Sequence, residues 1–112
     1  ALDTLAKRWP SSAYATDARL RMARIIDILG QDNLDICKFY YARHAYIAAA
    51  NRCSTVITRY QLSPAREEAL YYLARSYQHL NLHQLAQTTT SVLAYNYPKS
   101  KYLSELGSSA KP

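Results

Sequence analysis

Cys37 and Cys53 are the residues whose type could support covalent or metal chemistry in this chain. Their spacing leaves no close pair of ligands, so a zinc site is not expected. Both fall at positions where one helix should face another, and we interpret them as small buried core residues. A disulfide is the alternative, since paired helices can bring two Cα atoms within roughly 7 Å. It would also need an oxidising compartment.

The histidines of the chain are His44, His79 and His83. His79 and His83 are one helical turn apart, but Asn81 between them indicates a break. Positions near helix ends or on the surface are therefore favoured over metal ligation or catalysis. The sequence has no glycine-rich phosphate loop, no nucleophile-elbow serine and no carboxylate pair in an apolar setting. We expect neither an enzyme nor a bound cofactor.

The composition favours a helical, folded protein. With 112 residues, 49% of them apolar and 20% charged, the chain is one domain or part of one. Only 2 glycines and 4 prolines leave little material for turns. No apolar run approaches the roughly 20 residues of a membrane-spanning helix. The net charge of +6 is spread along the chain without a compact basic stripe, so nucleic-acid binding is not expected.

The segment Leu70–Pro98 has the internal pattern of a tetratricopeptide repeat (TPR). Bulky and small residues share one face of a first helix, a break follows at Asn81, and a second helix ends at Tyr97. The small residues Ala74 and Ala86 stand where two antiparallel helices approach closely. Such a repeat cannot bury its apolar face alone, so it stacks on its neighbours and leaves a surface for partners.

Superposing Tyr97 on Tyr60 reveals a second repeat upstream. Under that shift the paired positions keep their size class: Ala74 with Cys37, Tyr77 with Tyr40, Ala86 with Ala49 and Leu93 with Val56. Further upstream, helical spacing continues without loss of phase through Met22, Ile26, Leu29, Ile36 and Tyr40. We predict one unusually long helix over residues 13–44, bent at Gly30. Two helices separated at residues 30–33 are the alternative.

The predicted fold is an all-α, TPR-like α-solenoid of antiparallel helix pairs with one unusually long helix. Its module, residues 1–106, is divided into the end of a truncated repeat (1–9), a long-helix repeat (13–60), a complete repeat (64–98) and a short final helix (99–106). Residues 107–112 should form a flexible tail. We expect the chain to be a fragment whose leader or lipid anchor would lie upstream.

Two segments resemble a known family. Residues 14–22 follow a Trp-Pro-Ser-Ser turn, and the tyrosine-rich residues 39–52 end in the pattern Tyr-x-Ala-Ala-x-Asn-Arg. Together they are similar to the C-terminal half of the BamD family, the TPR lipoproteins of the outer-membrane β-barrel assembly machinery in Gram-negative bacteria. The similarity covers residues 1–102. His44 replaces a glycine usual in that family, and Gly30 interrupts a stretch usually without glycine.

The resemblance implies a non-catalytic scaffold at the periplasmic face of the outer membrane, held to the membrane only through an upstream lipid anchor. It implies docking onto the POTRA region of a BamA-like insertase and contact with accessory assembly lipoproteins. Arg52 is the first candidate for the POTRA contact, through a bidentate bond to a partner carboxylate; a solvated helix arginine is the alternative. Asn51, Tyr46, Arg43 and Arg59 are further candidates for the same surface.

Two other functions remain open at this point. A generic TPR receptor of the cell envelope or cytosol would take a short acidic or aromatic peptide on inward-facing tyrosine and basic residues. A helical enzyme or nucleic-acid binder would need a clustered polar pocket or a basic stripe, and the sequence shows neither.

Overall fold

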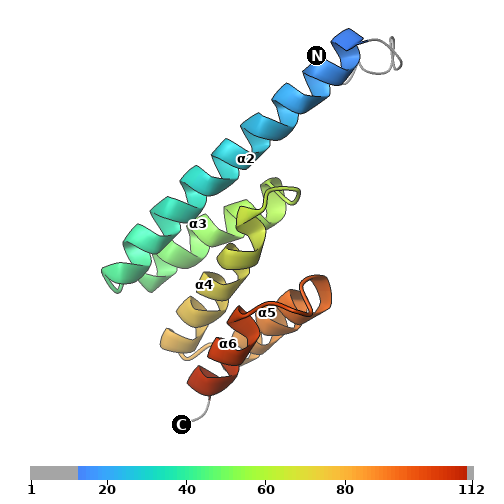
Figure 1. Ribbon diagram of the computed structural model, residues 1–112. Coiled ribbons are helices and arrows are strands. Elements are labelled where there is room, and N and C mark those ends of the chain that lie inside the picture. Colours follow the sequence, from blue (N-terminus) through green and yellow to red (C-terminus); the bar gives the residue numbers. More distant parts are fainter. Residues whose placement is uncertain (1–12, 111–112) are drawn as a thin grey trace.

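The computed structural model describes residues 13–110 of the chain, with side chains over residues 15–106. These residues form five helices: α2 (Ala13–Ala42), α3 (Tyr46–Arg59), α4 (Ala65–His79), α5 (His83–Asn96) and α6 (Tyr102–Ala110). Each helix packs on the next, and the described part contains no strand (Figure 1). The predicted all-α solenoid is confirmed. The truncated repeat predicted at residues 1–9 lies outside the described residues.

Helix α2 is one continuous helix of 30 residues. The prediction of one long helix is therefore confirmed, although the helix ends at Ala42 rather than at residue 44, and the alternative of two helices separated at residues 30–33 is wrong. Figure 1 shows the N-terminal half of α2 extending beyond the other helices. No helix among residues 13–110 combines the length and the apolar character that crossing a bilayer requires.

Gly30 is buried in the middle of α2 because the turn between α3 and α4 approaches it closely. A Cβ atom at this position would lie 2.7 Å from the Cβ atom of Ser63. The Ser63 hydroxyl accepts a hydrogen bond from the backbone N–H of Ala65 at 3.2 Å, which helps to start α4. The glycine that interrupts the sequence pattern is thus a contact point between α2 and this turn.

The two hairpins, α2–α3 and α4–α5, bury equivalent positions. In the first hairpin Cys37, Ala49 and Val56 are fully buried. Their counterparts in the second hairpin, Ala74, Ala86 and Leu93, are buried as well. Because small residues line both hairpins, the helix backbones approach closely. The correspondence inferred from the sequence shift therefore holds in the packing of the core.

Helix α6 closes the apolar core of the second hairpin. Its buried Leu106 packs in one cluster with Leu70 and Leu93. The helix begins at Tyr102, whose backbone N–H donates to the Ser100 hydroxyl at 3.2 Å. It continues to Ala110, so residues 107–110, which we expected in the tail, are helical.

Candidate docking surface

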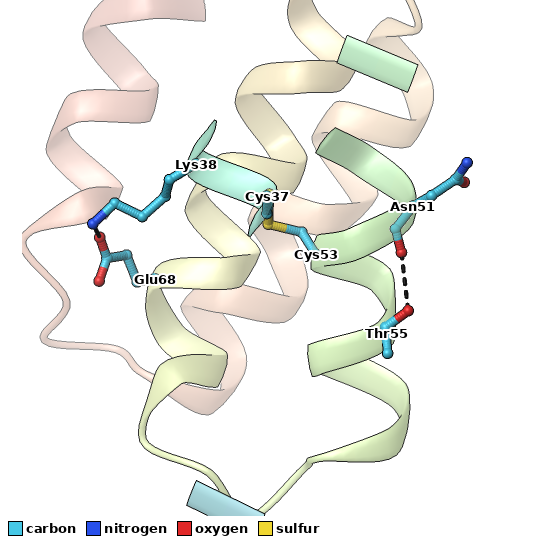
Figure 2. Close-up of a disulfide and its surroundings, with 6 residues drawn as sticks. All are labelled: Cys37, Lys38, Asn51, Cys53, Thr55 and Glu68. Atoms are coloured by element: carbon cyan, nitrogen blue, oxygen red, sulfur yellow. Dashed lines mark hydrogen bonds and ion pairs between the residues drawn. A yellow bond between two sulfur atoms is a disulfide. The ribbon is translucent and has the colours of Figure 1, made fainter. Parts of the chain in front are cut away.

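A disulfide joins α2 to α3 at the centre of the first hairpin (Figure 2). The Cα atoms of Cys37 and Cys53 are 5.6 Å apart, and both residues are fully buried. The interpretation as core residues is therefore correct. The disulfide, which the sequence left as an alternative, is also present.

Arg52 lies on the exposed side of α3, next in sequence to the disulfide. Its Nη1–H donates a hydrogen bond to Oδ1 of Asn33 on α2 at 3.3 Å. No carboxylate among residues 15–106 forms an ion pair with this guanidinium. Its planar fork of N–H donors suits a carboxylate, and the contact with Asn33 restrains its orientation. Arg52 can therefore bind an acidic group of a partner.

Arg52 borders a shallow depression between α2 and α3, which we call the Arg52 depression; its lining residues are Asp35, Ile36, Phe39, Tyr40 and Arg52. Phe39 is 51% exposed and Ile36 is 37% exposed, although both are large and apolar. Removing such side chains from water stabilises an interface. The depression thus combines the cation of Arg52 and the carboxylate of Asp35 with an apolar wall.

Arg43 belongs to the same surface through Phe39. The guanidinium carbon of Arg43 lies 3.6 Å from the centre of the Phe39 ring, a cation–π contact. Sequence reasoning singled out Arg43, did not assign Phe39 to this surface, and used Ile36 only as part of the apolar helical spacing, although the structure leaves it 37% exposed. The available signal was the spacing of three and then four residues from Ile36 through Phe39, on α2, to Arg43 in the turn that follows, because residues spaced in this way lie on one side of a helical turn.

Asn51 and Tyr46 lie beside a second depression at the start of α3, lined by His44, Ala45, Tyr46, Ile47, Ala48, Asn51 and Leu80. Asn51 is exposed, and its side chain points away from the disulfide (Figure 2). Tyr46 instead stacks on the ring of His79 at 4.3 Å. Arg59, exposed at the end of α3, lies about two helical turns from Arg52 and lines neither depression.

A polar aromatic cluster connects the first hairpin to α4. The Arg75 Nε–H donates to the Tyr41 hydroxyl at 3.1 Å, and that hydroxyl lies 3.2 Å from His79 Nε2. Since the Tyr41 oxygen already accepts from Arg75, its O–H is available to donate to a neutral His79. Partial desolvation of its ring lowers the pKa of His79, although the residue is exposed overall, and the charges of Arg75 and His44 add to this effect.

The fold defines a helical-repeat protein of the TPR-like solenoid class. The family model described as Outer membrane lipoprotein (YfiO) matches residues 1–93. The chain therefore belongs to this family.

Curated relatives extend the match. The chain is 44% identical over 99 residues to the outer membrane protein assembly factor BamD of Neisseria meningitidis serogroup A, covering 88% of this chain and 37% of the relative. It is 41% identical over 97 residues to BamD of Rickettsia prowazekii, covering 87% of this chain and 39% of that relative. For BamD of Pasteurella multocida the identity is 37% over 109 residues, covering 97% of this chain and 41% of that relative. The chain thus spans about two fifths of the length of these relatives.

The resemblance to the BamD family is confirmed by these matches. The names of the family and of its relatives agree with the location predicted from the sequence, the periplasmic face of the Gram-negative outer membrane. The five candidate partner-binding residues are not tested by the matches and stay predictions.

Proposed function

We propose that this chain is a non-catalytic docking module in outer-membrane protein assembly. It binds the POTRA region of a BamA-like insertase through the Arg52 depression, and accessory assembly lipoproteins bind elsewhere on it. It uses no cofactor, binds no nucleic acid and reaches the membrane only through a lipid anchor upstream. The observation that carries this proposal is the exposed Arg52, oriented by Asn33 and placed beside an apolar wall.

The physical character of the surface supports a protein partner. Residues that contribute most to binding free energy are enriched in arginine and large aromatic side chains at the centre of an interface. Here Arg52 would bind a partner carboxylate while Phe39 and Ile36 bury an adjacent apolar side chain. Arg43, held over the Phe39 ring, adds a second positive charge. An acidic residue next to an apolar one is therefore the partner feature that this surface fits.

The test is the affinity of the purified chain for a POTRA fragment of the BamA-like insertase from the same organism. Arg52→Glu should weaken binding by about 30-fold or more. The substitution removes the guanidinium that binds the partner's carboxylate and places a second negative charge beside that carboxylate. The matched control is Arg24→Glu, an equal charge change at an exposed position on the N-terminal half of α2. Equal losses in both variants would show an effect of net charge alone. Failure of the wild-type chain to bind would refute the proposed function.

A generic peptide receptor is the second candidate, favoured by a run of aromatic rings across α6, α4 and α2. Tyr102 stacks on Tyr71 at 4.8 Å, Tyr71 meets Tyr72 at 5.0 Å, and Tyr72 meets Tyr41 at 5.2 Å. Such rings can hold aromatic side chains of a short peptide. A peptide bound there would bind equally well to the Arg52→Glu variant, which separates the two functions.

A further inference from the structure

We propose that the Cys37–Cys53 dithiol is a substrate for a thiol–disulfide oxidant, and that the resulting bond holds the first hairpin in the form that docks. The second half of this inference rests on the proposed function. The first half concerns the hairpin alone and is tested without a partner.

The disulfide connects the two walls of the Arg52 depression. Cys37 follows Ile36, which lines the wall on α2, and Cys53 follows Arg52 on α3. A relative slide of the two helices would therefore change the spacing between the apolar wall and the guanidinium. The covalent bond restricts that slide at the level of the depression.

The disulfide distinguishes the first hairpin from the second. The second hairpin has Ala74 and Thr90 at the positions equivalent to Cys37 and Cys53, and it holds without a covalent link. The shared repeat packing therefore forms without a covalent link in the second hairpin, and the bond is an added feature of the first hairpin.

The burial of the sulfur atoms determines when the bond can form. Thiol–disulfide exchange requires access of a thiolate to the partner disulfide, but both cysteines are fully buried in the folded hairpin. Oxidation must therefore precede the closure of the hairpin or accompany it. Once formed, the bond is shielded from external thiols.

The reaction balances as an exchange with a dithiol–disulfide oxidant. One thiolate of the chain attacks the oxidant's disulfide and forms a mixed disulfide, and the second thiolate then displaces the oxidant. One S–S bond forms in the chain and one breaks in the oxidant. Two electrons pass to the oxidant, which leaves as a dithiol after taking up the two protons.

The experiment compares the same full chain with and without the bond. Denatured, reduced protein is refolded either with oxidised glutathione as the probe oxidant or with excess dithiothreitol, and free thiols are counted. The reduced form should melt about 10 °C lower, because a crosslink over a loop of this length constrains the unfolded chain. Its affinity for the POTRA fragment, measured where circular dichroism shows both forms folded, should be about tenfold weaker.

The matched variant is Cys37→Ala with Cys53→Thr, which copies the residue pair of the second hairpin. It should behave like the reduced wild-type protein and lose its response to oxidant. Two free thiols remaining after refolding with oxidised glutathione would overturn the oxidation of the pair. Equal melting temperatures of the oxidised and reduced forms would overturn the bracing role, and equal affinities would overturn the role in docking. If the oxidised chain binds no POTRA fragment, the proposed function and the docking half of this inference fail together, while the melting temperatures still decide the bracing half.

Discussion

At the scale of single residues, His44 and Asn81 occupy equivalent positions in the turns of the two hairpins. Each follows the first helix of its hairpin in the left-handed conformation, with φ of 63° for His44 and 61° for Asn81. In both turns the backbone N–H of the next residue donates a hydrogen bond to a carbonyl in the last turn of the helix. Ala45 donates to the Tyr40 carbonyl at 3.0 Å, and Leu82 donates to the Tyr77 carbonyl at 2.9 Å. A side chain with a Cβ atom is strained there, and the larger imidazole is less suited than asparagine.

His44→Gly should therefore stabilise the chain by about 1 kcal/mol, since glycine adopts positive φ without steric cost. The free energy of unfolding from urea titration measures this change. The matched variant Asn81→Gly should give a smaller gain, because asparagine already tolerates the conformation. A loss of stability in His44→Gly would contradict the strain argument, and would mean that the contact between the rings of His44 and Tyr46 matters more.

At the scale of elements, α2 and the turn before α4 fit together through Gly30. Glycine inside a helix usually lowers stability by about 1 kcal/mol relative to alanine. Here the close approach of Ser63 reverses that preference, because an added Cβ atom has no room. The Ser63 side chain cannot simply rotate away, since its own Cβ atom is one of the atoms in the way.

Gly30→Ala should accordingly destabilise the chain by about 1–2 kcal/mol, the net of an overpacking cost and the gain in helix propensity. Chemical denaturation of Gly30→Ala, Ser63→Gly and the double variant forms a double-mutant cycle. Removing the Ser63 side chain should make Gly30→Ala much less harmful. If Gly30→Ala stabilises the wild-type chain, or if the two changes are additive, the steric interpretation is wrong.

The helices could be predicted from the sequence because residues of similar size recur at regular intervals along it. Size classes repeated between the hairpins located the buried faces, and the unbroken phase of apolar residues predicted the long helix. The role of Gly30 could not be predicted, since the turn that contacts it lies thirty-three residues away and the contact appears only after folding. The same applies to the docking surface. Arg52 carries a local motif, but Phe39 joins it only once α2 and α3 are paired.

At the scale of the whole molecule, polar contacts connect the first hairpin to the second, among them an ion pair and a cluster of Tyr41, Arg75 and His79. Lys38 on α2 forms an ion pair with Glu68 on α4 at 3.0 Å (Figure 2), and this hydrogen bond raises the pKa of Lys38. Exposed pairs of this kind contribute up to about 1 kcal/mol. The second contact is the arrangement of Tyr41 between Arg75 and His79, and it depends on a neutral His79. Protonation of His79 should therefore weaken the contact between the two hairpins.

The last prediction concerns this junction. The pKa of His79 is lower in the folded chain than its usual value near 6.5, so the unfolded state binds more protons as the pH falls through 6.5. Stability at this site is present above that range and is lost below it. Protonated His79 would also donate toward a Tyr41 oxygen that already accepts from Arg75, and it would repel the Arg75 guanidinium.

The melting temperature should therefore fall by a few degrees, about 1–3 °C, between pH 7.5 and pH 5 on account of His79, a small change because the side chain is exposed. Carboxylates also titrate over this interval, so the measurement is the difference between variants. His79→Gln should flatten the pH response relative to the wild-type chain. His83→Gln, an equal substitution at an exposed residue at the start of α5, should leave it unchanged. If His79→Gln keeps the full pH response, the contact with Tyr41 and Arg75 does not control the junction between the hairpins.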